Sequence, residues 1–517
     1  MNAAAAVAPD IVSAREALRM PPSARVLPST PPDTFSPPRA LALAGLLLGW
    51  MSQVLFNDHP LGISLPLFTL ASIGALLHLA GPVAQARARG FLWLGPAIVV
   101  VSVFPALRDS PELVLLDVSV MVFLTLLLCA SLSGIHLLRL RPVQFVFAAL
   151  SGWLSSLTLP PGLIARSVRW KALEAKAGPL VRGVLLTVPL LLLFGLLFAS
   201  ADASFGRIFE RLFVPSGPSL TFGSLVWTPV AAFCFAGLFA LSSGLDSRAQ
   251  PEAIVGGKLG FIEGVVILVA LNALFWAFGA LQLLHLAADS TLPFRRPGIL
   301  SSDAREGFFQ LLWVTGLVLA LLLTLTHQTR RETLKADLVF KALASLLVVL
   351  SLVVAWSASH RLSLYEDAFG STLLRFYSHA FVGLLSLLLG GYLVTLWTRP
   401  ERFAALALQL SVAVLVAFNV ANPEVRIVEK NLAHFEATGG IDVGYLLRLS
   451  DDAVPLLLAN EERMHKTVPQ DRWVNDRYAS LHTTWPESEP WFTWNRARSR
   501  AHAARIAFPA RPESSEP

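Results

Sequence analysis

Charged and polar residues gather in three short stretches of an otherwise apolar chain. The stretches hold Asp202, Arg207 and Arg211; then Arg295, Arg296, Asp303, Arg305 and Glu306; then His360, Arg361, Tyr365, Glu366, Asp367 and Arg375. Guanidinium groups bind carboxylate or phosphate groups through two parallel hydrogen bonds, so paired arginines here favour an anion-binding site. Mixed charge in short loops is also typical of a solvated rim, and the residue types alone leave both interpretations open.

Polar residues inside the apolar segments are few. Asn272, Trp276 and Gly279 recur at helical spacing and would share one face of a helix, with Gln282 following near its end. This pattern fits a contact between helices made by small and polar residues, and it also fits the lining of a cavity. The candidate binding residues are therefore Asn272, Gln282, Asp202, Asp303, Arg305, Tyr365 and Arg375.

Charged residues within the apolar segments stand near the segment ends. Asp117, Glu263 and Lys341 fall within a turn or two of an end, where snorkelling relieves the cost of burial. We expect no Asp, Glu, Lys or Arg at the middle of a span. Ion-coupled transporters commonly place such groups near the bilayer midplane, so the pattern argues against a proton- or sodium-driven carrier. A neutral or lipid substrate remains compatible with it.

Standard catalytic and metal-binding signatures are absent from the sequence. It contains no phosphate-binding Gly-rich loop ending in Lys-Ser/Thr, no paired-His zinc helix, no Gly-x-Ser-x-Gly elbow and no kinase motif set. The histidines lack the spacing of metal ligands, so we predict no metal and no cofactor. Cys129 and Cys234 both fall in apolar segments, where we expect buried thiols without a disulfide.

The composition requires a membrane around these groups. Of the 517 residues, 54% are apolar and only 15% are charged, against about 25% charged in soluble domains. One soluble core could not bury so much apolar surface, whereas a bilayer accepts it in spans of about 20 residues. We attribute the net charge of +6 to cytoplasmic loops near anionic lipid. Nucleic-acid binding is not expected, because no basic run is interleaved with aromatic residues.

We predict an all-α protein, a polytopic transmembrane helical bundle of about eleven spans over residues 40–420. The apolar windows are 40–56, 61–80, 91–107, 113–138, 180–200, 223–244, 260–286, 307–327, 336–357, 376–398 and 402–420. A twelfth candidate, 143–163, is interrupted by Ser, Gly and Pro.

Loop charge decides whether 143–163 crosses. If it does not cross, one side of the membrane carries 20 Lys and Arg and the other carries 8. If it crosses, the split becomes 15 to 13, which is no bias. Because cytoplasmic loops are enriched in Lys and Arg, we predict a cytoplasmic N-terminus and an extracytoplasmic C-terminus. Segment 143–182 is then an interfacial or re-entrant element on the cytoplasmic side.

The two ends of the chain differ from the bundle. Residues 1–39 are rich in Pro and predict a disordered cytoplasmic tail. Residues 421–517 predict a small, soluble helical domain on the outer face. There, Asn422-Pro423 has the pattern of an N-cap followed by the first helical residue, Gly439 ends that helix, and Asp442 caps the next.

Several segments resemble a bacterial family of multi-pass membrane proteins described as domains of unknown function 4153 and 4173. The matching stretches are Ser302 to Phe308, Arg361 to Tyr365 running on to Arg375, Asn422-Pro423 to Asn431, and Ile441 to Leu447 followed by Asp452 and Pro455. The resemblance covers roughly residues 180 to 500. It implies the architecture and the membrane location, and no reaction.

Three functions fit these observations. The first is a non-enzymatic protein of a bacterial inner membrane, a sensor, assembly factor or transporter-like component, which recognises a lipid or envelope component at its outer face. The second is a transferase acting on lipid-linked substrates, for which Asp58 offers an acidic residue in the first outer loop. The third is a facilitator that moves a neutral solute through the bundle.

Overall fold

A computed structural model describes residues 38–57, 59–135, 137, 142–158, 222–242, 259–289, 300–465, 481–482 and 490–508. Within these ranges the chain forms helices and one isolated β-bridge between Leu259 and Thr329, and no strand. The predicted all-α class is confirmed.

Nine helical segments of the described ranges are long and apolar enough to cross a membrane. They correspond to α2 (Pro38–Phe56), α3 (Ser64–Arg87), α4 (Leu94–Leu107) with the 3-10 turn η2 (Arg89–Phe91), α5 (Pro111–Leu132), α11 (Phe261–Asp289), α12 (Leu300–Gln328), α13 (Leu334–Phe369), α14 (Leu373–Trp397), and α15 (Phe403–Ala421) with η4 (Pro400–Arg402). Helix α10 (Phe222–Ser242) contributes a shorter apolar segment, Thr228–Ser242. The predicted window 180–200 lies outside the described residues. The polytopic bundle is confirmed, and eleven stays a prediction for the number of spans.

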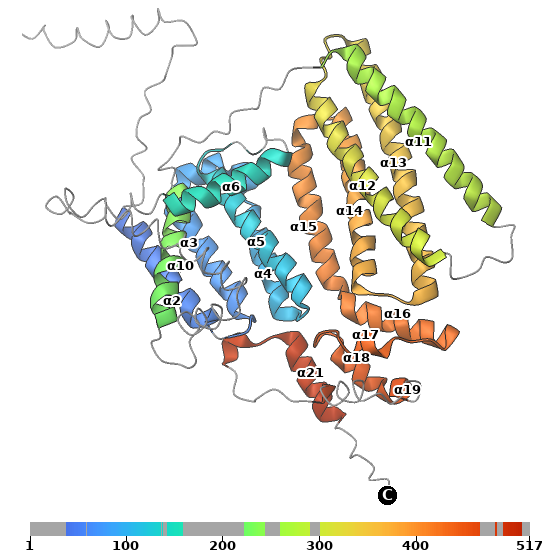
Figure 1. Cartoon of the computed structure of the whole chain (residues 1–517). Coiled ribbons are helices and arrows are strands. Elements are labelled where there is room, and N and C mark those ends of the chain that lie inside the picture. The colour runs from blue at the N-terminus through green and yellow to red at the C-terminus, as the bar shows by residue number, and fades with distance from the viewer. Residues whose placement is uncertain are drawn as a thin grey trace, which may run out of the picture.

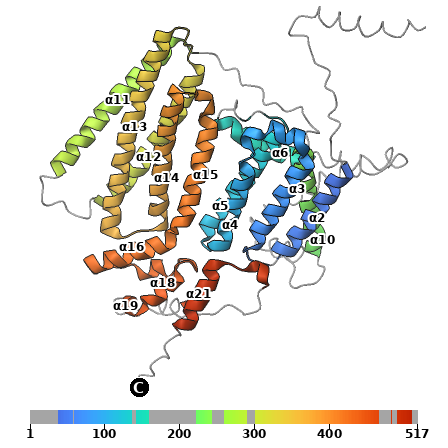
Figure 2. The same cartoon turned by 180° about the vertical axis from the view of Figure 1, so that it is seen from behind.

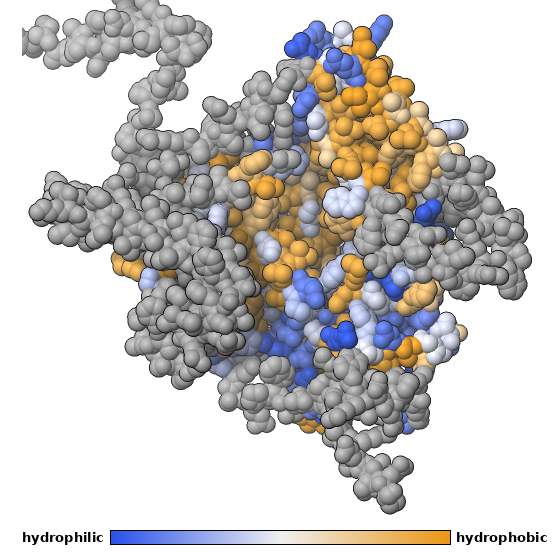
Figure 3. All heavy atoms as spheres, in the orientation of Figure 1, coloured by the Kyte–Doolittle hydropathy of each residue, from blue (hydrophilic) through white to orange (hydrophobic). Residues whose placement is uncertain are grey.

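The transmembrane helices form two bundles that stand side by side (Figures 1 and 2). Helices α2 to α5, α6 (Pro142–Thr158) and α10 share one apolar core, and α11 to α15 share another. Helix α15 joins them, because its Leu415 and Phe418 pack into the first core while its Phe403 packs into the second. Figure 3 shows the apolar surface of α11 to α15 with hydrophilic residues at both of its ends.

Close backbone contact fixes α2 against α10, which follows it by well over 150 residues. A Cβ atom added at Gly49 would lie 2.6 Å from the backbone nitrogen of Ala232, and one added at Gly45 would lie 2.8 Å from the Ala232 carbonyl oxygen. Spacing small residues four apart lets two membrane helices approach this closely. The first span is therefore held by a helix from the middle of the chain.

Helix α6 lies across the bundle end that is remote from residues 423–507, and does not run alongside α4 and α5 (Figure 1). It packs on α5 and α10, where Gly152 faces Leu241 and Leu126. Residues 159–182 of the predicted interfacial segment lie outside the described residues, so the path of the whole segment stays a prediction.

Short helices after α15 cover the opposite end of both bundles (Figures 1 and 2). They are α16 (Pro423–Thr438), α17 (Val443–Leu446), α18 (Val454–Ala459), α19 (Glu461–His465) and α21 (Arg496–Ala507), and we call them together the C-terminal domain. Its own apolar core includes Ile427, Leu446, Leu457 and Ala501. The domain thus packs internally as well as on the bundles.

The predicted helix ends in this domain are largely right. Gly439 ends α16 with a φ of 73°, and the Asp442 carboxylate accepts from the Tyr445 amide, 2.9 Å away, at the start of α17. Pro423 is the first residue of α16 as expected. The cap is wrong, because Asn422 has a φ of 51° and makes no side-chain cap bond. Its amide instead donates to Asp452, a tertiary contact that outweighs capping.

Candidate functional site

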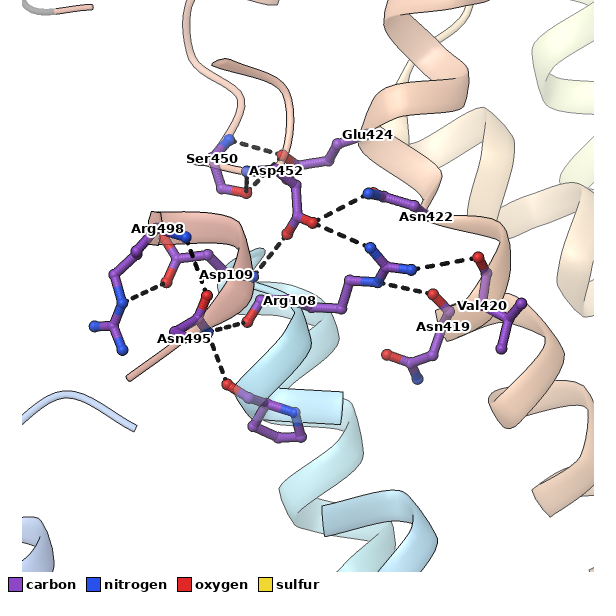
Figure 4. Close-up of polar contacts among 11 residues, drawn as sticks. Arg108, Asp109, Asn419, Val420, Asn422, Glu424, Ser450, Asp452, Asn495 and Arg498 are labelled. Atoms are coloured by element: carbon purple, nitrogen blue, oxygen red, sulfur yellow. Dashed lines mark hydrogen bonds and ion pairs between the residues drawn. The ribbon is translucent and has the colours of Figure 1, made fainter. Parts of the chain in front are cut away.

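Asp452 of the C-terminal domain is the centre of a polar cluster where the domain meets both bundles (Figure 4). Its side chain accepts from the Arg108 guanidinium at 3.4 Å, from the Asp109 amide at 2.7 Å and from the Asn422 amide at 3.1 Å. Asp452 is only 7% exposed. A buried carboxylate is tolerated when donors surround it, and here they come from the α4–α5 loop and the α15–α16 junction.

Arg108 ties the first bundle to the end of α15 (Figure 4). Its Nε donates to the Asn419 carbonyl at 2.8 Å, and its Nη2 donates to the Val420 carbonyl at 3.3 Å. The last carbonyls of a helix lack partners within it and carry partial negative charge, so a guanidinium there is stabilising. Through Arg108, the end of α4, the end of α15 and the C-terminal domain form one hydrogen-bonded unit.

Asn495, at the start of α21, adds a second link to the same loop. Its amide donates to the carbonyls of Pro105 and Arg108, both at 2.9 Å, while its Oδ1 accepts from the Arg498 amide. One side chain therefore caps the end of α4 and the beginning of α21. Arg498 extends the contact to the α2–α3 loop through the Leu61 carbonyl at 2.6 Å.

Burial raises the pKa of the carboxyl groups in this cluster. Glu424 is 2% exposed, and burial raises its pKa to about 7, although it accepts hydrogen bonds from the Ser450 amide and hydroxyl. Burial also raises the pKa of Asp109 to about 6 against the opposing charge of Arg498. The pKa of Asp452 is raised for the same reason. Several acids thus face one another in a confined space, and their ionisation opposes close packing.

Tyr365 and Arg375, two of the predicted binding residues, lie together at the end of the second bundle that the C-terminal domain covers. The Arg375 guanidinium lies 4.3 Å from the centre of the Tyr365 ring, and it donates to the carbonyls of Phe369 and Gly370. These carbonyls end α13, so Arg375 caps that helix. The structure brings the pair together and engages the guanidinium in a structural contact.

Glu366, beside this pair, anchors the second bundle to α16. Its carboxylate lies 3.1 Å from the Lys430 ammonium and 3.6 Å from the His379 ring. Asn431 of α16 bonds both the amide and the carbonyl of Ser371. The C-terminal domain is therefore attached to each bundle by its own set of polar contacts.

Asn272 makes a contact between helices. Its amide donates to the Leu343 carbonyl of α13 at 3.0 Å and to the Leu268 carbonyl of its own helix at 2.8 Å. Trp276, four residues later, is 66% exposed, so its side chain takes no part in this buried contact. This geometry favours the helix contact over the lined cavity.

The remaining predicted residues cannot be joined to these clusters. Asp303 and Arg305 fall in the first turns of α12 and Gln282 in α11, with side chains outside the described set. Asp202 and Asp58 lie outside the described residues. Among the residues that are described, no group of three or more His, Cys, Asp or Glu could hold a metal, and Cys129 and Cys234 are both free thiols.

A groove of about 730 Å³ opens between α5 of the first bundle and α14 and α15 of the second. It is lined by Glu112, Leu115, Leu116, Ser119, Val120, Leu312, Tyr377, Ser378, Ala380, Phe381, Leu384, Ser411, Val414, Leu415 and Phe418. Figure 3 shows an apolar hollow between the two bundles. The groove runs inward from the bundle end that the C-terminal domain covers, because α5 and α14 begin there and α15 ends there.

The polar groups that remain available to a ligand lie at that end of the groove. Glu112 is in the first turn of α5, and the Tyr377 hydroxyl is buried without a hydrogen bond. Deeper in, the Ser119 and Ser411 hydroxyls donate to carbonyls of their own helices at 2.7 and 2.9 Å. The groove is therefore polar at its outer end and apolar along its length.

Asp117 shows where reasoning from the sequence failed. The expectation that it snorkels to water is wrong, because Asp117 is 1% exposed and accepts a 2.8 Å hydrogen bond from Asn419 of α15. An acid in an apolar window was the available signal. The pairing of Arg108 with Asp452 was not predicted because the two residues stand 344 positions apart.

We expect Arg108→Ala to loosen the C-terminal domain. Removing one partner of a buried pair leaves the Asp452 carboxylate uncompensated, at a cost of about 3 kcal/mol. Limited proteolysis of the purified protein should then cleave residues 440–510 faster than in the wild type. Arg426→Ala is the control, because Arg426 forms an exposed pair with Glu429. Equal protection of the Arg108 variant and the control would contradict this role.

The stability of the folded protein should fall as the pH rises from 4.5 to about 7, the ordinary and folded pKa values of Glu424. A folded pKa above the unfolded one means that the folded state holds a proton which the unfolded state releases in this range. Glu424→Gln should therefore flatten the pH dependence of the thermal midpoint. Glu436→Gln, at an exposed pair with Arg463, should leave it unchanged. A wild-type midpoint that rises over this range would refute the assignment.

One known protein family matches most of this sequence. The family described as a domain of unknown function, DUF4153, matches residues 95–460. That range runs from α4 to the end of α18 and includes well over half of the 517 residues. No curated protein and no solved structure gives a significant match. The resemblance noted in the sequence is confirmed: the chain is a membrane-embedded member of the DUF4153 family.

Proposed function

We propose that this protein binds an amphipathic lipid in the groove between α5 and α14–α15, and that the C-terminal domain covers the headgroup end. The observation that supports this proposal most directly is the groove itself. Its volume of about 730 Å³ falls within the roughly 300–1,000 Å³ of small-molecule sites. A lipid-binding role of this kind fits a sensor, an assembly factor or a transporter-like component of the membrane.

The apolar length of the groove suits an acyl chain. Its walls are Leu, Val and Phe side chains, and Leu115 and Leu116 of α5 are exposed. The deeper serines satisfy their hydroxyls within their own helices, so they offer an acyl chain no unpaired polar group. An acyl chain entering sideways from the bilayer would meet mainly apolar contacts there.

The outer end of the groove suits a headgroup that donates hydrogen bonds. Glu112 is the charged residue of the lining, and its carboxylate accepts from the Ser110 hydroxyl at 3.2 Å. The Tyr377 hydroxyl is buried and unpaired beside the same end. A carboxylate with spare lone pairs and a free hydroxyl favour an ammonium or hydroxyl headgroup. A purely anionic headgroup would be repelled by Glu112.

We further propose that the membrane is a bacterial inner membrane and that the C-terminal domain lies outside the cytoplasm. Basic residues occupy the turns at the remote end of the bundles: Arg87 and Arg89, Arg330 and Arg331, Arg399 and Arg402. Cytoplasmic loops are enriched in Lys and Arg, so this distribution supports a cytoplasmic remote end.

Reporter fusions test this orientation. A reporter active only outside the cytoplasm should be active when fused after Pro517 and silent when inserted at residue 170. A reporter active only in the cytoplasm should give the reverse pattern. A silent outer reporter at Pro517, together with a fluorescent cytoplasmic one, would put the C-terminal domain on the other side.

Ser119→Trp should weaken lipid binding by roughly tenfold, equivalent to about 1.4 kcal/mol. Ser119 is exposed on α5 and lines the groove, so an indole there fills space that the acyl chain would use without entering a packed core. Native mass spectrometry of the purified protein, titrated with a phospholipid bearing an ammonium headgroup, measures the effect.

Thr324→Trp is the matched control. Thr324 is exposed on α12, its hydroxyl donates to a carbonyl four residues earlier as that of Ser119 does, and it does not line the groove. It should retain wild-type lipid binding. Equal lipid binding by both tryptophan variants would reject the groove as the site.

A further inference from the structure

Asp117 is an ionisable residue buried inside a membrane-spanning helix. It stands six residues after Pro111, the first residue of α5, which places it about 9 Å along the helix. Its side chain is 1% exposed. Charged groups at such positions are costly, and in membrane proteins they commonly mark ion or proton sites.

Asp117 has one hydrogen-bonding partner, the neutral amide of Asn419. The Asn419 Nδ2 donates to Asp117 Oδ1 at 2.8 Å and to the Leu415 carbonyl at 3.1 Å. Both acceptors require the nitrogen on this side, so the amide orientation is determined. The other oxygens, Asp117 Oδ2 and Asn419 Oδ1, are both buried without a partner. Two acceptor oxygens on hydrogen-bonded side chains are thus left without a donor.

The surrounding charges do not neutralise Asp117. The cation on the neighbouring α4–α5 loop, Arg108, directs its donors to the carbonyls of Asn419 and Val420 and to Asp452. From α14, the residue that faces this region is Tyr377, whose ring packs on Phe418. The other ionisable groups at this end are the acids Glu112 on α5 itself, Glu424 on α16, and Asp109 and Asp452 at the junction, and the cation Arg498, which lies 3.8 Å from Asp109. None of them forms an ion pair with Asp117.

We propose that Asp117 and Asn419 form a binding site for a monovalent cation, a proton or Na⁺, which neutralises the buried carboxylate. Desolvating a carboxylate beside a neutral amide is strongly unfavourable, and a bound cation removes that cost. A proton would occupy Oδ2 and turn it into a donor. Sodium, a hard cation, would bind through oxygen atoms of this kind. In either case the cation neutralises the buried carboxylate.

Such a site would be linked to the junction through Asn419. The side chain of Asn419 holds Asp117, while its backbone carbonyl accepts from Arg108, which in turn contacts Asp452. Phe418, the preceding residue, lines the groove. The state of the cation site therefore acts on the residues that attach the C-terminal domain and on one wall of the groove.

The test uses the full-length protein in lipid nanodiscs, with Asp117→Asn and with Asp337→Asn as the control. Asp337 is also a helix acid, but it is paired with Arg331 and Lys341 near the remote end. In one arm, the thermal midpoint is measured at alkaline pH in NaCl and in N-methylglucamine chloride of equal ionic strength. In the other arm, infrared spectroscopy follows the carbonyl band of a protonated carboxylic acid across pH without Na⁺.

Stabilisation by Na⁺ that Asp117→Asn abolishes and Asp337→Asn retains would identify sodium. A carboxylic-acid band lost in Asp117→Asn and kept in Asp337→Asn would identify a proton. Asn419→Ala keeps the carboxyl group and removes both the Nδ2 donor to Asp117 and the free Oδ1. It should shift the Na⁺ midpoint by about tenfold or the pH midpoint by about one unit. This variant keeps the proposal testable if Asp117→Asn does not fold. An Asp117 carboxylate that stays ionised down to the ordinary Asp pKa of about 4, with no response to Na⁺, would overturn the proposal.

Discussion

The ion pair between Arg108 and Asp452 is the interaction on which the arrangement of this molecule depends. It joins residues 344 positions apart and brings the end of α4, the end of α15 and the C-terminal domain to one point. Each bundle has an apolar core of its own, and apolar contacts in a bilayer give little preference for one bundle arrangement over another. Directional polar contacts at the membrane surface therefore supply the specificity that burial does not.

The groove exists because each bundle packs around its own apolar core while polar contacts at one end hold the two bundles together. The two bundles meet along α15 and at Phe376, Tyr377 and Ala380 of α14, which also pack on the first core. Space is left where α5 faces α14, and the C-terminal domain covers that space at one end. The polar groups needed to attach the domain are then necessarily near the mouth of an apolar groove. The packing of α5 against α15 produces two features. It forms part of the apolar groove with its polar outer end, and it buries Asp117 of α5 against Asn419 of α15.

Much of the architecture could be predicted from the sequence, because each membrane span is a contiguous run of apolar residues. Runs of about 20 apolar residues mark spans, and the windows that became α3, α5 and α13 needed no tertiary knowledge. Asp442 and Gly439 were recognisable for the same reason, since caps act within one turn. The polar cluster around Asp452 and the burial of Asp117 could not be predicted from the sequence. Asn422 left its expected cap for Asp452, and Asp117 was buried by Asn419, because partners distant in sequence decided both.

The links of α21 to the first spans set an order for assembly. Asn495 bonds the end of α4 across 390 residues, and Arg498 bonds the α2–α3 loop across 437. Until residues this late in the chain leave the ribosome, the carbonyls of Pro105 and Leu61 must rely on water or lipid headgroups. Contacts so distant in sequence form slowly and last. Docking of α21 is thus the step that supplies the last hydrogen-bond partners of helices that entered the bilayer early in synthesis.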